Sequence, residues 1–214
     1  MFGRQKGTDV SGGNHFRQVK SIPLAELATV TAGPSGSLLE NLHDGPEGVP
    51  VLAPANFTEN HDVNGRGLRR IPKADMKKLA RFTLKDSDLV VVRQGAIGRL
   101  AVIGVEQSGW LYSSSCLRVR TRGRIVSPRY LAYYLSHPAV RKDLMDRALP
   151  GTVTSINTSV LNELMVAVPS LLQQDQIVEA LRSVDDEIAT HQAMAERLRS
   201  LKPAILDKLT GRSE

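Results

Sequence analysis

The chain has 214 residues, 41% of them hydrophobic and 23% charged, a composition typical of globular proteins that excludes wholesale disorder. No stretch of sequence approaches the ~18 uncharged apolar residues of a membrane helix, and the single cysteine, Cys116, excludes an internal disulfide framework and indicates a reducing cytoplasm. The net charge is +6, and residues 173–214 hold six basic and eight acidic residues, so residues 1–172 carry all of the positive excess. This positive charge over residues 1–172 is compatible with a polyanionic partner, of which nucleic acid is the first candidate.

The first twenty residues are rich in glycine and lack apolar periodicity, which predicts a flexible leader over 1–20. No apolar run follows its basic residues, so it does not resemble a secretory signal. From Ile22 to about Pro169, short apolar runs alternate with glycine, proline and asparagine, and we predict one domain over 21–172. Strands are expected over 49–52, 89–92, 100–105 and 115–121.

Glycines separate two of these strands, because Gly95 and Gly98 lie between 89–92 and 100–105 and predict a strand–turn–strand unit. Pro128 stands where a helix can start, and aromatic and aliphatic residues follow it at helical spacing. A further apolar stretch covers 160–168. Many short strands with few helices predict an α+β fold.

The last forty residues differ in kind: 171–209 contain no glycine, and Pro203 is the only helix breaker. Apolar residues recur there with gaps of four and three, which predicts a long helix with a coiled-coil seam. The seam residues, which we expect at a dimer interface, are Ile177, Leu181, Val184, Ile188, Ala195 and Leu198, with His191 at one intervening position.

This helix needs a partner. The 29 residues of 174–202 span about 44 Å, too long to lie wholly against one small domain. We therefore predict that the segment 173–214 pairs either with another helix of its kind or with a different protein. The alternative is an amphipathic helix folded back on the body. Near Pro203 we expect a kink or a second short helix.

Motifs of catalysis are absent from the sequence, which has no phosphate-binding G-x-x-x-x-G-K-[ST], no G-x-G-x-x-G and no G-x-S-x-G. The five histidines do not have the spacing of metal ligands. The nearest set of carboxylates is Asp86, Asp88 and Glu106, and Asp86-Ser87-Asp88 fits a turn before a strand. The sequence therefore predicts a binding protein without a catalytic or metal site.

Two clusters of basic residues are candidates for DNA contact. The first consists of Arg66, Arg69, Arg70, Lys73, Lys77, Lys78 and Arg81, and the second of Arg118, Arg120, Arg122 and Arg124, with Arg129 after it. Alternation places Arg118 and Arg120 on one face of a strand and leaves Leu117 and Val119 for the core. Arginine suits both phosphates and guanine edges, although a solvated strand face explains either cluster alone. Aromatic residues are only 4%, which disfavours stacking on single-stranded RNA.

Three segments together have the pattern of a known family. The first runs from Ile22-Pro23-Leu24 to Thr31-Ala32-Gly33, and the second, over 88–99, has the form D-L-apolar-apolar-apolar-R-x-G-x-x-G. The third comprises Gly151-Thr152 through Ile156-Asn157, then Leu164-x-Val166-x-Val168-Pro169, then Gln173-Gln174-x-Gln176-Ile177-Val178. Over roughly residues 22–210 the chain resembles the specificity subunit of type I restriction–modification systems. It departs from the family in having Ser170 and Gln173 where a second proline and a glutamate are usual.

The resemblance implies a DNA target-recognition domain over 21–172 and a helix over 173–214 for dimerisation and methyltransferase docking. A full family member has two such domains and two long antiparallel helices, so this chain resembles half a subunit, and a homodimer would rebuild the whole. Such a dimer would bind double-stranded DNA at two inverted half-sites. The loops after Gly33 and over 151–157 are then expected near DNA.

The resemblance also implies that this chain is not itself an enzyme. An adenine methyltransferase subunit using S-adenosylmethionine would modify the DNA, and a restriction and translocase subunit would cleave it. The expected DNA-binding residues are Ser35, Ser37, Arg66, Arg69, Arg70, Lys73, Lys77, Lys78, Arg93, Arg118, Arg120, Arg122, Thr152, Thr154 and Asn157. Two alternatives remain open: a free-standing dimeric DNA-binding regulator, and an assembly module whose helix recruits a protein.

Overall fold

Three small β-sheets form the body of the protein in the computed structural model, which describes residues 19–149, 151 and 154–211. A four-stranded sheet has the order β2 (Ala28–Ala32), β8 (Cys116–Thr121), β5 (Leu89–Val92), β6 (Leu100–Val102), all antiparallel. A three-stranded sheet has the order β4 (Arg69–Ile71), β3 (Val49–Leu52), β7 (Leu111–Tyr112), and β1 (Lys20–Pro23) pairs with β9 (Met165–Val168). The predicted α+β class is confirmed. The expected leader lies outside the described residues except for Val19 and Lys20, and Lys20 belongs to β1.

The four-stranded sheet separates two hydrophobic cores. Because side chains alternate along a strand, one face contributes Leu89, Val91, Leu117 and Val119 to a core shared with the helices. The other face contributes Val90, Val92 and Cys116 to a core shared with the three-stranded sheet. Both faces of β5 and β8 are therefore buried.

Most of the expected strands are present. Strands form at 49–52 and 89–92 as predicted, and the strand expected over 115–121 spans Cys116–Thr121. The strand expected over 100–105 ends at Val102. Gly95 and Gly98 have φ of 77° and 80°, so they form the tight turn between β5 and β6 that their spacing predicts.

Short helices cover the sheets: α1 (Leu24–Leu27), α2 (Met76–Leu79), α3 (Pro128–Ser136), α4 (Pro138–Asp146) and α5 (Thr158–Asn162). Pro128 is the first residue of α3, as its position predicts. The apolar stretch over 160–168 divides into the end of α5 and strand β9. Asn157 starts α5, because its Oδ1 accepts a hydrogen bond from the Val160 amide at 3.0 Å.

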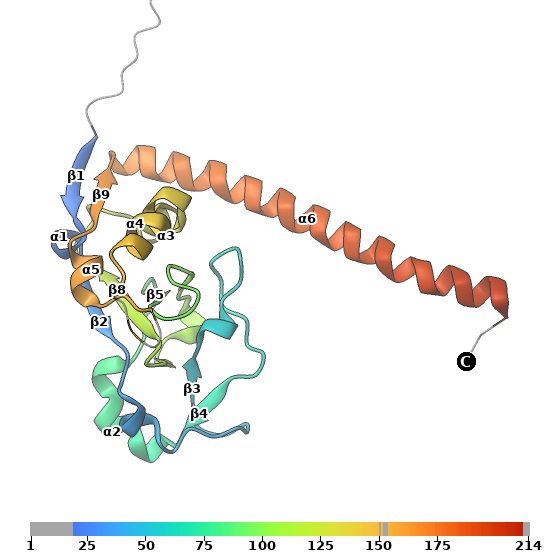
Figure 1. Cartoon of the computed structure of the whole chain (residues 1–214), viewed down its shortest axis with the longest axis horizontal. Coiled ribbons are helices and arrows are strands. Elements are labelled where there is room, and N and C mark those ends of the chain that lie inside the picture. Colours follow the sequence, from blue (N-terminus) through green and yellow to red (C-terminus); the bar gives the residue numbers. More distant parts are fainter. Residues whose placement is uncertain (1–18, 150, 152–153, 212–214) are drawn as a thin grey trace, which may run out of the picture.

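The long helix α6 (Leu171–Thr210, 40 residues) leaves the body beside β9 and extends far beyond it (Figure 1). Ser170 and Gln173 form a capping box at its start, and Gly211, with φ of 67°, ends it. The second short helix expected near Pro203 as one of two possibilities is wrong, since one helix runs through this residue. Proline removes only its own amide donor, and the helix is exposed here, so water can satisfy the freed carbonyl.

The first turns of α6 are fixed to the body. The Gln174 side chain is fully buried; its Nε2 donates to the carbonyls of Ile125 (3.0 Å) and Pro169 (2.9 Å), and its Oε1 accepts from the Ser127 amide (2.7 Å). Further along, the Tyr133 hydroxyl on α3 donates to Asp185 at 2.6 Å. The helix thus starts in a defined direction and then projects into solvent. Among the described residues, no helix combines the length and the apolar character needed to cross a membrane.

Candidate nucleic-acid interface

Arg118 lies inside the protein, in the middle of β8. It is 7% exposed and faces the core beneath the three-stranded sheet. Its Nη1 donates to the carbonyls of Arg81 (3.1 Å) and Thr83 (3.0 Å), and its Nη2 donates to Thr31 Oγ1 at 3.3 Å. The expectation that this residue faces DNA is therefore wrong: its guanidinium holds the segment 81–83 against the sheet.

Arg120 forms an ion pair with a buried carboxylate. Its Nε and Nη2 donate to the two carboxylate oxygens of Asp88 at 2.6 and 2.7 Å, and Asp88 is 1% exposed. The hydrogen bonds to Asp88 raise the pKa of Arg120. This ion pair gives Arg120 a structural role, and its DNA contact stays a prediction.

Arg122 is exposed but stands at the other end of the strand. Its Nε donates to Thr29 Oγ1 at 3.0 Å and its Nη1 to the Ala25 carbonyl at 3.3 Å. It therefore lies beside α1, at the end of β8 opposite Cys116. The second basic cluster predicted from the sequence does not form one surface.

Several loops gather at the Cys116 end of the four-stranded sheet. We call this region the loop end; it comprises residues 33–37, 93–98, 113–115 and the described part of 149–157. The Gly33 amide donates to the Cys116 carbonyl (3.0 Å), and the Arg93 amide donates to that of Ser115 (2.9 Å). At Gly33 a Cβ atom would lie 2.1 Å from the Ser113 carbonyl oxygen, so only glycine permits this close approach.

The loop end brings together five of the predicted contact residues from three distant segments. The Ile156 amide donates to the Arg93 carbonyl at 2.9 Å, and Gln94 forms a β-bridge with Ser155. Ser35, Ser37 and Thr154 are exposed, Arg93 is half-buried and Asn157 caps α5. Asn157 thus fixes the end of this loop to the start of α5. Thr152 lies outside the described residues.

The three-stranded sheet and the segment 66–81 beside it carry the first basic cluster; we call this part the basic lobe. Arg66, Lys73, Lys77 and Lys78 are exposed, and none of them forms an ion pair within the described residues. Figure 1 shows α2, β3 and β4 at the end of the body away from the start of α6. These four cations are available to a polyanion.

Two arginines of the same cluster have structural partners. Arg69 Nη2 donates to the Leu42 carbonyl at 2.7 Å and lies 3.8 Å from Asp44, and Arg70 Nη1 donates to the Gly48 carbonyl at 3.1 Å. They hold the loop 42–48 against β4. The basic lobe also adjoins the loop end, because the Asn41 side chain, shortly after Ser37, donates to Asp75 at 2.8 Å.

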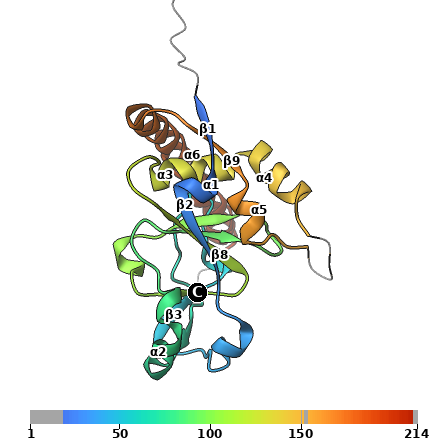
Figure 2. The same cartoon turned by 90° about the vertical axis from the view of Figure 1, so that its left-hand side faces the viewer.

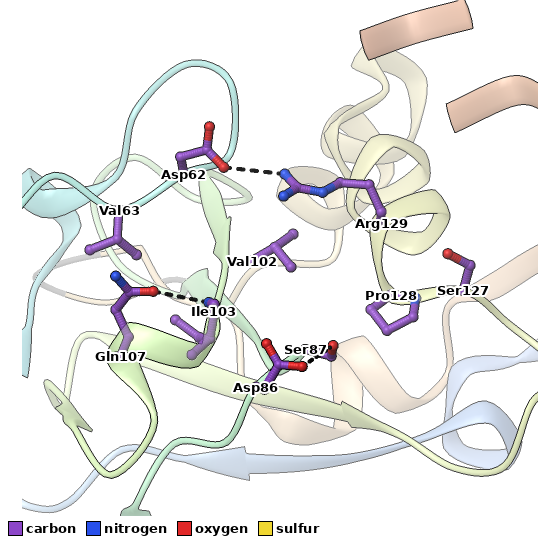
Figure 3. A pocket seen from close by; sticks show the side chains of 11 residues that line it. Asp62, Val63, Asp86, Ser87, Val102, Ile103, Gln107, Ser127, Pro128 and Arg129 are labelled. Atoms are coloured by element: carbon purple, nitrogen blue, oxygen red, sulfur yellow. Dashed lines mark hydrogen bonds and ion pairs between the residues drawn. The ribbon is translucent and has the colours of Figure 1, made fainter. Parts of the chain in front are cut away.

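A hollow of about 470 Å³ lies on another side of the body, between the loop at 62–63, the turn at 86–87 and the start of α3 (Figure 3). Arg129 closes one side by an ion pair of 3.3 Å with Asp62. The described lining contains carboxylates but no histidine or cysteine, and no group of three potential metal ligands occurs among the described residues. Asp86 and Asp88 flank Ser87, whose φ of 66° makes the turn expected from the sequence. This hollow has no arrangement of groups that indicates catalysis.

The seam of α6 is exposed along its length. Ile177 and Leu181 are each 38% exposed, Val184 54%, Ile188 45% and Leu198 58%, while Ala195 is half-buried. Figure 2 shows the start of α6 beside α3, at the end of the body opposite α2. The alternative of a helix folded back on the body is wrong, since only its first turns are anchored there.

The sequence missed three polar anchors. Asp88 inside the sheet, Gln174 beneath α6, and the contact of His61 with Tyr133 all depend on residues far apart in the chain. The rings of His61 and Tyr133 meet edge to face with centroids 5.6 Å apart, and burial lowers the pKa of His61. A sequence signal existed only near Gln174: the pattern Ser170-x-x-Gln173 is that of a capping box, and it places the start of α6 at Leu171.

Comparison with known proteins agrees with this architecture. Residues 17–199 match the family model of the type I restriction modification DNA specificity domain. The chain is 25% identical over 167 residues to the type I restriction enzyme EcoBI specificity subunit of Escherichia coli, covering 76% of this chain and 35% of that protein.

Solved structures of specificity subunits share the fold. The HsdS subunit from Thermoanaerobacter tengcongensis matches with a TM-score of 0.57 and 18% identity, over 96% of this chain and 46% of that one. The S subunit from M. genitalium matches with a TM-score of 0.59 and 16% identity, over 94% and 48%. A chain from a structure of a type I R-M system matches with a TM-score of 0.64 and 21% identity, over 96% and 47%. This chain spans about half the length of these structures and about a third of the Escherichia coli protein.

Proposed function

Because the chain belongs to the family of type I restriction–modification DNA specificity domains, we propose that it recognises a specific sequence of double-stranded DNA for such a system. The family match over residues 17–199 is the observation that carries this proposal. The unpaired cations of the basic lobe and the polar loop end beside it support the proposal. A cytoplasmic location, where the DNA lies, follows from this role.

The two regions would divide the work of recognition. Arg66, Lys73, Lys77 and Lys78 are exposed cations suited to phosphates, which supply affinity without reading sequence. The loop end carries hydroxyl groups and the Arg93 guanidinium, which can reach base edges. Arg118 acts behind this surface, since its guanidinium holds the end of the basic lobe at Arg81 against the sheet.

Methylation and cleavage would fall to partner proteins. We expect an adenine methyltransferase subunit, which binds S-adenosylmethionine, to modify the recognised site, and a restriction and translocase subunit to cut unmodified DNA. This chain would present the DNA and would itself catalyse neither step.

A homodimer would supply the second half of the recognition site. The chain has one recognition body and one exposed helical seam, about half the length of the solved specificity subunits. Pairing through α6 would hold two bodies apart by the length of a 40-residue helix, about 60 Å, which corresponds to about 18 base pairs at ~3.4 Å each. Two-fold symmetry then makes the half-sites inverted repeats.

Selection of bound sequences from a random DNA pool by the purified chain tests the proposal. We expect a bipartite motif with inverted half-sites separated by unconstrained bases, and binding that weakens steeply with salt. Adding candidate methyltransferase subunits separates the alternatives. Methylation of the selected motif supports the specificity role, whereas tight binding that no methyltransferase exploits supports a free-standing regulator. Failure to enrich any motif, with or without a methyltransferase, would remove the proposal.

A further inference from the structure

We propose that Tyr133 is a positioning residue for DNA recognition: its hydrogen bond to Asp185 fixes the direction of α6 and thereby confines the recognised half-sites to one separation. This inference deepens the two-part recognition of the proposed function and rests on it. It traces a property of the DNA site to one contact inside the chain.

Two polar contacts, about 16 Å apart along the helix, attach α6 to the body. The inner contact is the buried Gln174 side chain, whose hydrogen bonds to backbone groups fix the first turn. The outer contact is Asp185, about three turns further along, which accepts a hydrogen bond from the Tyr133 hydroxyl at 2.6 Å. The inner contact alone would let the helix pivot about its first turn, whereas the two contacts together define a direction.

Asp185 makes the outermost hydrogen bond between the described part of α6 and the body. It is half-buried, and every described residue that follows it is exposed except Ala195, which is half-buried. Figure 1 shows this part of the helix extending away from the body. The segment 186–210 spans about 38 Å. Within the described residues, no bond to the body further out can therefore restore the direction of the helix once the Asp185 contact is lost.

The length of α6 amplifies a small change of angle at its base. A pivot of about 5° at Gln174 moves Thr210, about 54 Å away, by about 5 Å, which exceeds the ~3.4 Å rise of one base pair. A hydrogen bond that can lengthen by about 0.5 Å allows a pivot of only about 2° when it lies about 16 Å from the pivot point. Such a pivot moves the far end by less than about 2 Å. The Tyr133 contact is therefore tight enough to hold the separation to one base pair.

The loop that carries His61 holds Tyr133 in place from behind. The two rings meet edge to face with centroids 5.6 Å apart, and the His61 carbonyl accepts a hydrogen bond from the Val102 amide of β6 at 2.8 Å. One turn earlier on α3, Arg129 forms an ion pair of 3.3 Å with Asp62 of the same loop (Figure 3). The outer contact thus connects the four-stranded sheet to α6 through this loop and α3.

The chemistry of the outer contact suits a fixed connection. Burial, together with the hydrogen bond to Asp185, raises the pKa of Tyr133 far above its usual range, so the phenol keeps its proton and continues to donate near neutral pH. A hydrogen bond to a carboxylate is shorter and stronger than one between neutral groups. A tyrosine side chain also has few torsions, so it adds little freedom of its own.

Pulsed electron paramagnetic resonance on the full chain tests the proposal without DNA. Spin labels on Lys78→Cys of α2 and Ser200→Cys of α6 measure the distance between the body and the outer part of the helix. Both sites are exposed, and the native Cys116 is buried. Labelled chains are diluted into an excess of unlabelled wild type, so that only distances within one chain are detected. We expect one narrow distribution, which Tyr133→Phe should widen at least about twofold because the pivot is no longer limited to about 2°.

Tyr134→Phe is the matched control, because it removes a tyrosine hydroxyl from the same helix whose acceptor, the Met165 carbonyl at 3.0 Å, belongs to β9. Its distribution should stay as narrow as that of the wild type. Asp185→Asn keeps an oxygen that can accept the Tyr133 hydroxyl and should also stay narrow. Asp185→Ala, which leaves the cores of the body intact, should widen the distribution as Tyr133→Phe does. An unchanged width in Tyr133→Phe or Asp185→Ala, or an equal widening in Tyr134→Phe, overturns the proposal.

Selection from a random DNA pool then tests the consequence for recognition. The Tyr133→Phe chain should select the same half-sites as the wild type, at a wider range of separations. A contact that served stability alone would weaken binding without changing the separation, and that result also overturns the proposal. The two proposals fail separately. A wild type that selects no motif removes the recognition role, whereas unchanged distance distributions remove only the positioning role of Tyr133.

Discussion

Arg120 on β8 and Asp88, the residue before β5, form a two-pronged ion pair whose carboxylate is almost entirely buried. The Lys85 amide donates a further hydrogen bond to Asp88 at 2.8 Å. Beside this pair, Arg118 ties the segment 81–83 to the same sheet. Arg120 therefore neutralises a buried carboxylate within the sheet, and Arg118 holds the end of the basic lobe against it.

Removing Arg120 should destabilise the fold. Arg120→Ala leaves the Asp88 carboxylate buried and uncompensated, which should lower the free energy of unfolding by about 3 kcal/mol. Urea denaturation followed by circular dichroism measures this loss. Arg122→Ala, at an exposed residue just past the end of the same strand, should change stability by less than about 0.5 kcal/mol. Equal effects of the two substitutions would show that the buried pair has no special role.

The arginine pattern shows where prediction from the sequence stops. Alternation correctly placed Arg118 and Arg120 opposite Leu117 and Val119, because strand geometry alone fixes it. It could not show that the second face of the strand is also buried, since the covering sheet comes from residues 49–52, 69–71 and 111–112. Sequence alternation distinguishes the two faces of a strand but does not say which of them meets solvent.

The long helix was predictable for the opposite reason. A seam with a repeat of four and three residues is local information, so the long helix and its exposed apolar stripe from Ile177 to Leu198 followed from spacing alone. Pro203 was misleading, because its single lost hydrogen bond lies in exposed helix that water can satisfy. The contacts of His61 and Asp185 with Tyr133 join residues 72 and 52 positions away, and no local pattern could reveal them.

Lysines of α2 should contribute to DNA affinity but not to stability. Lys77→Ala together with Lys78→Ala removes two exposed cations, so binding should weaken for specific and nonspecific DNA alike. The slope of log K against log salt should become shallower by about 2 if both lysines contact phosphates. Fluorescence anisotropy at several salt concentrations measures both quantities. Lys208→Ala, at the far end of α6, is the matched control. An equal change in affinity and salt slope for this variant would show that the basic lobe does not contact DNA.

The thiol of Cys116 should be unreactive in the folded protein. Burial raises its pKa to about 12, so almost no thiolate is present near pH 8. A chromogenic disulfide reagent should modify the native chain at least about a hundredfold more slowly than the urea-unfolded chain. Prompt reaction of the native protein would show that the core between the two sheets opens readily.

Acid should loosen the contact between the loop at 57–63 and α3. Burial lowers the pKa of His61 from 6.5, so the unfolded chain binds this proton more readily than the folded chain. The contribution of neutral His61 to the free energy of unfolding is therefore complete above pH 6.5, and it declines as the pH falls through and below that value. The urea midpoint at pH 7.5 and 5.5 measures the decline.

His61→Asn is the matched variant for this pH dependence, because His61 has φ of 62° and asparagine tolerates that conformation. The variant should lose less stability between pH 7.5 and 5.5 than the wild type does. An unchanged decline would assign the pH dependence to other groups and leave His61 without a part in it.

The central claim is that this chain directs DNA methylation at a two-part site. The most direct measurement is a single-molecule methylome of the source strain with the gene intact and with the gene deleted. We predict that deletion abolishes N6-methyladenine at one bipartite motif with inverted half-sites, as a homodimer requires. A methylome that does not change on deletion would contradict the claim, and loss of a non-palindromic motif would contradict the homodimer.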